Sequence, residues 1–533
     1  MKLKSFIIAG ASALALGALS LPATAQTFTF AFQADAQSLD PHSLNETFTL
    51  GLLGNVYEGL ISYDKDMNKV PTLAVGWEVL TPTKWRFDLR QGVKFHNGND
   101  FTAEDVVFTW ERMGSEGSDQ KTLAGLLENI TIIDDYTIEI DTPIPNPTLL
   151  NDLVTMYIMD KEWAVANNAT ESSSPADAGR DGSYATSNAN GTGPFMVESR
   201  QPDVKTVLVR NENYWDDSIP TNVQRVEFTP ISQAATRVAA LLSGQIDLVY
   251  PVPVQDWSRL DNADGVKALT GPEARTIFLG MDQSRDELLY SSVKGANPFK
   301  DPRVRHAFAF AIDVNAIKET IMRGAATPSG LMWAPQIQGY NAEANTPHPF
   351  DPDKARSLLA EAGYADGFTV TMDCPNDRYV NDEKICQAVA GMLAKVGVTI
   401  DLLAQPKSQY FAKVLAQGGY DTSFYLLGWT PGSMDVFNVF NNLLACRNEE
   451  GTVGGFNLGG YCNERIDELG RIVASETDVA VRQAAIDEAA QILKDEAGYI
   501  PLFQQPLSWG VRDGVSVAQR ADNVLDLRNV VMP

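Results

Sequence analysis

The side chains that could perform chemistry are the histidines and the carboxylates, and their spacing matches no catalytic motif. The four histidines, His42, His96, His306 and His348, stand apart, and none has a second histidine at metal-binding spacing. The sequence contains no G-x-S-x-G, H-E-x-x-H, P-loop or G-x-G-x-x-G pattern. The 68 acidic residues must form some close pairs by chance, and no spacing marks the two carboxylates of a hydrolase. We therefore predict no enzymatic activity, no metal site and no cofactor.

The N-terminus has the pattern of a secretory signal. Lys2 and Lys4 precede an apolar run over 6–21, and small residues then form an A-x-A site that ends at Ala25. The apolar run is shorter than the roughly 20 residues of a spanning helix, which disfavours a membrane anchor. No cysteine follows the cleavage site, so the attachment point of a lipoprotein is missing. We predict that residues 1–25 are a cleaved signal peptide and that the mature protein is free in the periplasm.

The four cysteines favour disulfides in such an exported chain. They are Cys374, Cys386, Cys446 and Cys462, and none forms the C-x-x-C pair typical of zinc sites. Four cysteines allow three pairings, and the sequence does not choose among them. Pairing of nearest neighbours, Cys374 with Cys386 and Cys446 with Cys462, is the simplest. Closing the second loop would contribute about 3 kcal/mol.

Length and charge limit the class of protein and its partners. A chain of 533 residues exceeds the size of one hydrophobic core, so two or three domains are expected. The net charge of -26 opposes binding to nucleic acid, anionic lipid or polyphosphate. The same charge is compatible with a cationic or zwitterionic ligand, although an acidic surface also serves solubility. The mean hydropathy of -0.16 is that of a soluble protein.

Helices and short strands alternate along the chain. Thr102 opens an apolar stripe that ends near Met113, and Asp351-Pro352 opens another that Gly363 closes. Helices are also expected over 304–312 and 385–396, and strands over 206–209, 369–372 and 398–403. Residues 167–190 have no apolar period and are predicted to be a loop. The fold class is therefore α/β or α+β.

Several motifs occur in an order that resembles a known family. The strongest block runs from Phe87 to Gly98 and continues into the helix start at Thr102. Others lie at 38–42, 55–60, 70–77, 191–195, 211–215, 237–247 and 301–305. Together they are similar to the dipeptide-, oligopeptide- and nickel-binding class of periplasmic solute-binding proteins of ABC importers. The matches cover residues 38 to about 470, nearly the whole mature chain.

The resemblance implies a periplasmic-binding-protein fold of the α/β class. Two lobes would close about a hinge over a buried ligand, and an extra domain would be inserted in the N-terminal lobe. The implied lobe I is discontinuous, with residues 26–59, 191–281 and 502–533. The extra domain would be 60–190, and lobe II would be 282–501.

The resemblance also implies how a ligand carboxylate is held. In peptide-binding members a basic side chain after a strand of the second lobe binds the carboxylate, and Arg378, followed by Tyr379, stands at the matching place. A guanidinium offers bidentate geometry to a carboxylate. The alternative is a structural ion pair with Asp377, Asp382 or Glu383, which lie nearby in sequence.

In the peptide-binding members that the sequence resembles, an aspartate shortly after a Gly-Trp pair usually binds the ligand ammonium. Here Gly428-Trp429 is followed by Pro431 and Gly432 where the acid is expected, and the first aspartate is Asp435. Either Asp435 reaches the site from a shifted loop, or the ligand carries no ammonium there. Trp429 could stack on the ligand or belong to the core.

Asp35 and Gln37 are further candidate ligand contacts from the first lobe. The resemblance implies a monomer that delivers a peptide or other small polar solute to a cognate ABC permease and ATPase at the inner membrane. An opine, an oligosaccharide or a glutathione-like molecule is the alternative ligand, and few histidines disfavour nickel. An exported hydrolase is the alternative from another class. A receptor subunit that signals would use the same pocket and is not separated by the sequence.

Overall fold

The computed structural model describes residues 26–177, 183–476 and 478–533. The predicted signal peptide and part of the predicted 167–190 loop lie outside these residues. Within the described ranges, no helix combines the length and apolarity needed to cross a membrane. The predicted α/β class is confirmed, because helices pack on several sheets of mixed strand direction.

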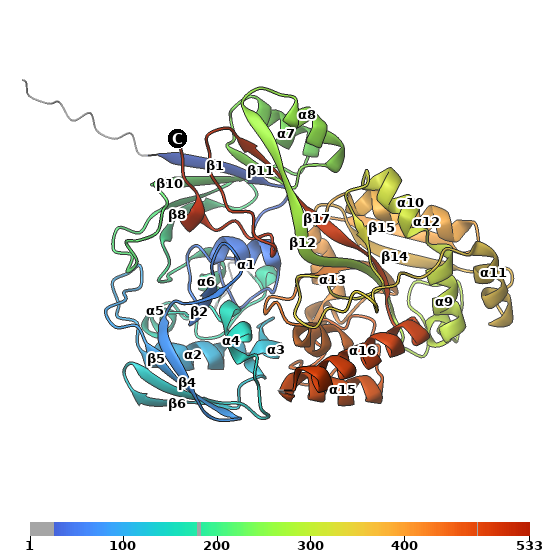
Figure 1. The fold of residues 1–533 in the computed structure, drawn as a ribbon, viewed down its shortest axis with the longest axis horizontal. Helices are drawn as coiled ribbons and strands as arrows, with labels where there is room; N and C mark the ends of the chain where they lie inside the picture. The colour runs from blue at the N-terminus through green and yellow to red at the C-terminus, as the bar shows by residue number, and fades with distance from the viewer. Residues whose placement is uncertain (1–25, 178–182, 477) are drawn as a thin grey trace, which may run out of the picture.

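One long mixed sheet runs through the molecule (Figure 1). In the described part of the chain it has eleven strands, in the order β15-β14-β16-β12-β17-β11-β1-β10-β9-β8, with β13 paired to β17. The bounds are β1 (Thr27–Phe32), β8 (Phe195–Gln201), β9 (Lys205–Arg210), β10 (Arg225–Pro230), β11 (Leu248–Tyr250), β12 (Val266–Met281), β13 (Thr327–Pro328), β14 (Thr369–Pro375), β15 (Thr399–Gln405), β16 (Phe424–Trp429) and β17 (Ile500–Arg512).

The two longest strands, β12 and β17, join the two halves of this sheet. At one end β17 pairs with β11, and at the other end β12 pairs with β16 through Thr276–Met281. The register between β12 and β17 shifts between Pro272 and Thr276, which marks a bulge where the strands pass from one half to the other. Figure 1 shows both strands crossing the middle of the molecule.

A second, antiparallel sheet lies apart from the long one. Its order is β4-β5-β7-β6, and a separate hairpin, β2-β3, precedes it in the chain. Their bounds are β2 (Ile61–Tyr63), β3 (Lys69–Pro71), β4 (Ala74–Thr81), β5 (Lys84–Leu89), β6 (Asn129–Asp134) and β7 (Thr137–Asp141). Helix α2 (Ala103–Met113) packs on this sheet, and Val106 and Met113 are buried with Phe87 in one core.

The remaining helices cover the long sheet or fill the loops between strands. They are α1 (Thr47–Leu53), α3 (Lys121–Ala124), α4 (Leu149–Asp152), α5 (Lys161–Ala166), α6 (Tyr184–Ser187), α7 (Ala234–Leu242), α8 (Trp257–Asp261), α9 (Pro302–Ala311), α10 (Val314–Ala316), α11 (Pro352–Glu361), α12 (Asp382–Ala394), α13 (Lys407–Val414), α14 (Phe437–Val439), α15 (Glu464–Ser475) and α16 (Val479–Glu496). Short turns η1 (Leu153–Thr155), η5 (Ile317–Ile321) and η7 (Phe440–Leu444) continue α4, α10 and α14.

The predicted helix starts and disulfides are confirmed. Asp351 caps α11 by accepting a hydrogen bond from the Lys354 amide, and Pro352 is the first helical residue. The cysteines pair as nearest neighbours, Cys374 with Cys386 and Cys446 with Cys462. The first of these links joins β14 to α12, which lie beside each other.

Candidate ligand-binding site

A cavity with about 1730 Å³ of empty space, part of it open to solvent, lies where both halves of the long sheet meet the second sheet's domain. Most of its walls come from four stretches of chain, around 44–63, 120–157, 378–456 and 520–528, and Thr72, Pro194 and Arg275 complete the lining. Within the described chain, its charged lining residues are Glu46, Glu58, Asp152, Arg275, Arg378, Arg520, Asp522, Asp526 and Arg528.

Glu46 lies at the N-terminus of α1 and binds two cations from the other half of the sheet. Its carboxylate accepts hydrogen bonds from the first amides of the helix, and it lies 3.1 Å from Arg378 Nε and 3.0 Å from Lys407 Nζ. Burial tends to raise the pKa of Glu46, but Lys407 and Arg378 outweigh it and hold that pKa well below its usual value. Arg378 and Lys407 therefore share one carboxylate as their direct ion-pair partner, and Asp377 lies close enough to act on both cations.

Arg378 follows β14 and extends into the cavity wall. Its Nε atom pairs with Glu46, and its guanidinium lies over the Tyr379 ring, 5.0 Å from the ring centroid. Among the described residues, no side chain or carbonyl binds its two terminal amino groups. The expected alternative partner Asp382 accepts instead from the backbone amides of Arg378 and Tyr379. The fork of Arg378 is therefore available to a carboxylate inside the cavity.

Tyr379 and Gly428 form the part of the wall beside Arg378. The Tyr379 hydroxyl donates to the Gly428 carbonyl at 3.3 Å, and both residues line the cavity. A Cβ atom on Gly428 would lie 2.8 Å from the Tyr379 ring. Glycine at this position therefore allows the tyrosine ring to lie flat against β16.

Trp429 presents its ring to the cavity from the end of β16. Its indole nitrogen donates to Asn438 Oδ1 at 2.9 Å, and its ring lies 5.0 Å from that of Phe456. These contacts fix the ring, which remains partly exposed and lines the cavity. Trp429 thus offers an aromatic surface on which a planar or apolar part of a solute can pack.

The structure places the other three predicted contacts away from the cavity lining. Asp435 is fully buried and forms an ion pair with Arg482 at 2.6 Å. Asp35 pairs with Arg200 at 3.2 Å, and the Gln37 amide donates to a threonine hydroxyl of α1. In this structure a second charge of the chain therefore balances each of the two aspartates.

Arg275 is a lining residue that sequence reasoning missed. It lies at the bulge of β12, where its Nε atom is 2.7 Å from Glu273 and an amino group donates to Thr47 at 3.2 Å. Glu273 also accepts from Gln505 of β17 at 2.7 Å. The bulge turns these side chains toward α1, so the crossing strands and the first helix are joined by polar contacts. No local pattern in the sequence signals this role.

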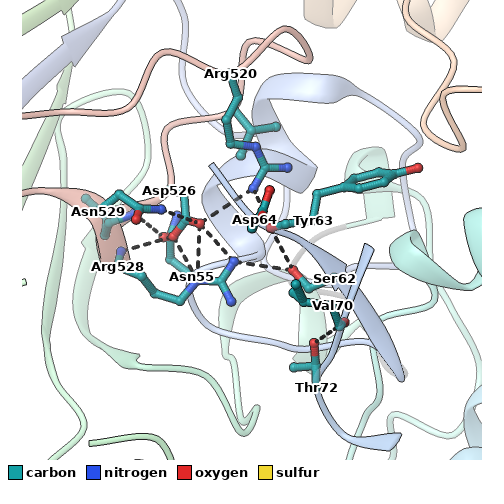
Figure 2. Close-up of polar contacts among 12 residues, drawn as sticks. Asn55, Ser62, Tyr63, Asp64, Val70, Thr72, Arg520, Asp526, Arg528 and Asn529 are labelled. Carbon is teal, nitrogen blue, oxygen red and sulfur yellow. Dashed lines mark hydrogen bonds and ion pairs between the residues drawn. The ribbon is translucent and has the colours of Figure 1, made fainter. Parts of the chain in front are cut away.

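The C-terminal segment closes one side of the cavity with alternating charges. Figure 2 shows Asp526 between Arg520 and Arg528, with ion-pair distances of 3.5 and 2.8 Å. The two arginines also donate to the Tyr63 carbonyl and the Ser62 hydroxyl. This group satisfies its own charges, and it attaches the end of the chain to the β2 strand.

Glu58 is a buried carboxylate of the lining that neutral donors satisfy. It accepts hydrogen bonds from the Tyr214 hydroxyl at 2.7 Å, the Trp215 indole at 3.0 Å and the Thr192 hydroxyl at 2.8 Å. Burial raises its pKa above the usual value. These partners come from the motifs at 191–195 and 211–215, so those motifs serve to hold Glu58 in place.

The sequence and fold are similar to those of known binding proteins. Residues 68–451 match the model of the bacterial extracellular solute-binding proteins, family 5. The glutathione-binding protein GsiB of Salmonella typhimurium strain LT2 is 27% identical over 476 residues, which cover 88% of this chain and 87% of GsiB.

Two solved structures show the same fold. One is the periplasmic binding protein DppA of Helicobacter pylori with the peptide STSA, with a TM-score of 0.84, 23% identity and coverage of 95% of this chain and 98% of DppA. The other is AgaA of A. tumefaciens R10 with agropinic acid, with a TM-score of 0.82, 21% identity and coverage of 95% and 99%. The family match, which spans most of the chain, shows that this protein belongs to the family 5 bacterial extracellular solute-binding proteins.

Proposed function

We propose that this protein captures a peptide or glutathione-like solute through its carboxylate and delivers it to an ABC permease. The observation that carries the proposal is the cavity wall at Arg378. Arg378 shares the Glu46 carboxylate with Lys407, and the terminal amino groups of Arg378 have no protein partner among the described residues. A solute carboxylate would bind these amino groups with bidentate hydrogen bonds.

The relatives support a peptide-like solute without identifying it. GsiB is described as glutathione-binding, and DppA was solved with a peptide. Both kinds of ligand carry a carboxylate, as Arg378 requires. AgaA, with agropinic acid, shows that this fold also accommodates a solute of another class.

We infer that capture is a closing motion of two lobes. The proposed lobe I is 26–59, 191–281 and 502–533, the extra domain is 60–190, and lobe II is 282–501. Because β12 and β17 pair with strands of both halves, they support two lobes, and we propose the bulge between Pro272 and Thr276 as the hinge. This hinge would assign Thr276–Met281 to lobe II, a few residues before the boundary that the resemblance implies. Contacts from Glu46 to Arg378 and Lys407 exist only while the lobes are together, so a solute at Arg378 favours the closed form.

The location and partners follow from the family and the sequence. Members of this family are extracellular binding components, and we propose that residues 1–25 are removed during export to the periplasm. The permease and the ATPase would receive the solute from the closed protein.

Native mass spectrometry and thermal unfolding test the proposal. The purified protein should carry a small solute with a carboxylate, and a solute at a hundred times its Kd should add about 2.7 kcal/mol to the free energy of unfolding. Arg378→Ala should abolish this gain, because Lys407 still balances Glu46 while the carboxylate contact is lost. Arg259→Ala, at an exposed arginine, is the matched control. A gain that is equal in the Arg378→Ala and wild-type proteins would exclude the carboxylate role.

A further inference from the structure

Asp152, at the end of α4, is a buried acid in the cavity wall without a counterion. It is 5% exposed and lines the cavity, and Asn146 Nδ2, at 3.3 Å from Oδ2, is the neutral donor to its carboxylate. Within the described chain, no lysine or arginine lies within ion-pair distance of it. This distinguishes Asp152 from Glu58, whose carboxylate has three strong donors.

The charged groups that face Asp152 are already engaged elsewhere. Asp435 and Arg482 pair with each other, and Lys69 donates to the amide oxygen of Asn151 at 2.6 Å. Arg482 cannot turn to Asp152 without leaving the buried Asp435 unpaired, and Lys69 binds the neighbouring Asn151 from the surface. Burial of an unpaired carboxylate is costly, so a cation delivered by another molecule would be bound strongly here.

Asp152 also lies beside the loop of residues 430–435, which follows Gly428-Trp429. The Ser433 carbonyl accepts hydrogen bonds from Asn151 at 2.7 Å and from Tyr63 at 2.9 Å. A Cβ atom on Gly432 would lie 3.3 Å from the side chain of Thr155. The α4–η1 segment is therefore packed on the loop in which Pro431 and Gly432 replace the expected acid.

We propose that Asp152 binds a cationic group of the solute, such as a primary ammonium, and selects for zwitterionic solutes. This inference rests on the proposed function and adds a second contact of opposite sign. Arg378 would bind the carboxylate from lobe II, and Asp152 would bind the cation from the extra domain. The acid is then supplied by a different part of the chain, which explains why the Gly-Trp loop can do without one.

The pH dependence of binding follows from the surroundings of Asp152. Burial raises the pKa of its carboxyl to about 7, and Asn146 offsets this only in part. Asp435 raises the pKa further, while Lys69 and Arg482 lower it. An ammonium binds the ionised form, so affinity for a cationic solute should rise with pH by up to tenfold per unit below about pH 7 and level off above it.

The experiment compares wild-type protein with Asp152→Asn and with Asp135→Asn, an exposed acid of the same domain. Solute that co-purifies is released by denaturation, identified by mass spectrometry and tested for amine labelling. Calorimetry then measures binding of glutathione, a dipeptide mixture and their N-acetylated forms. We expect an amine-bearing solute in the wild type. Asp152→Asn should weaken the affinity for the free-amine probes at least about 10-fold and leave the affinity for the N-acetylated forms unchanged. Asp135→Asn should have the wild-type affinity for every probe.

Two results would overturn the role of Asp152 while leaving the proposed function intact. One is a co-purified solute without any cationic group. The other is equal affinity and an equal pH profile for amine probes in wild type and Asp152→Asn. A wild-type protein that carries no solute and binds no probe would instead overturn the proposed function. The pH dependence of amine-probe affinity can be measured on the wild-type protein alone. The role of Asp152 therefore remains testable if Asp152→Asn folds poorly.

Discussion

Replacement of Glu46 by Gln should destabilise the ligand-free protein more than any exposed charge substitution. The single Gln amide oxygen can still accept a hydrogen bond from one of the two helix amides that Glu46 caps, so part of the helix cap is preserved. What is lost is the negative charge between Arg378 and Lys407, which lie 3.1 and 3.0 Å from it. The two buried cations would then lose their direct ion-pair partner and repel each other, with Asp377 as a more distant negative charge.

The size of this effect follows from the burial of the group. Glu46 is 3% exposed, and Lys407 and Arg378 are also buried. Removal of one partner from a buried ion pair costs about 3–5 kcal/mol, because the remaining charge is left uncompensated. Since Arg378 also borders the cavity and can be hydrated there, we expect the lower end, about 3 kcal/mol of unfolding free energy.

Denaturant unfolding of the protein freed of bound solute, followed by tryptophan fluorescence, measures the difference in unfolding free energy between wild type and Glu46→Gln. The matched control is Glu319→Gln, at a carboxylate that is 67% exposed and paired with Lys318 at 3.7 Å. The pKa of Glu46 is lowered in the folded protein, so its contribution is present above the usual pKa and is lost only when pH falls below it. The difference from wild type should thus be constant between pH 5 and 8. Equal midpoints for Glu46→Gln and the control would refute the counterion role.

Three further predictions concern single groups. Burial raises the pKa of Asp152 from 3.8 to about 7, so the folded state binds a proton that the unfolded state has lost. The free energy of unfolding should therefore fall as pH rises from about 4 to about 7. Asp152→Asn should remove this fall, as measured by denaturant midpoints across that pH range. Gly428→Ala should lower the unfolding free energy by about 1–3 kcal/mol and weaken solute binding, since the new Cβ meets the Tyr379 ring; an unchanged Tm and affinity would contradict this. Replacing Cys446 and Cys462 by Ser should cost about 3 kcal/mol by calorimetry, and a reduced wild type that melts like the oxidised one would argue against it.

The helices could be predicted from the sequence because their signals are local. Asp351, Pro352 and Gly363 lie within one stretch of chain, and each acts on the helix beside it. The strand order could not be predicted in the same way. Strand β1 lies between β10 and β11, and β12 lies between β16 and β17, so the neighbours are set by contacts between distant residues. The resemblance to a family implied two lobes, but it did not indicate that β12 and β17 would pair with strands of both halves.

Site residues could be predicted where the order of the family motifs located them. They could not be predicted where their role depends on a partner far away in the sequence. Arg378 and Trp429 were identified from their place in the family pattern, and both line the cavity. Asp435 could not be distinguished from a ligand contact, because its partner Arg482 is 47 positions away. Asp152 had no signal of its own, since its importance comes from the absence of a nearby cation. Glu46 did have one, because it directly precedes a run of apolar residues that becomes α1.

The attachment of the C-terminal segment has a consequence for biogenesis. Leu525, Leu527 and Met532 belong to the same hydrophobic core as Phe28 of β1, and the Pro533 carbonyl accepts a hydrogen bond from Gln26. In the export that we propose, a polypeptide threaded from its N-terminus cannot complete this core until residues 525–532 emerge. Translocation would be finished before the first strand is locked, and a chain broken off near its end would leave that core open to chaperones and proteases.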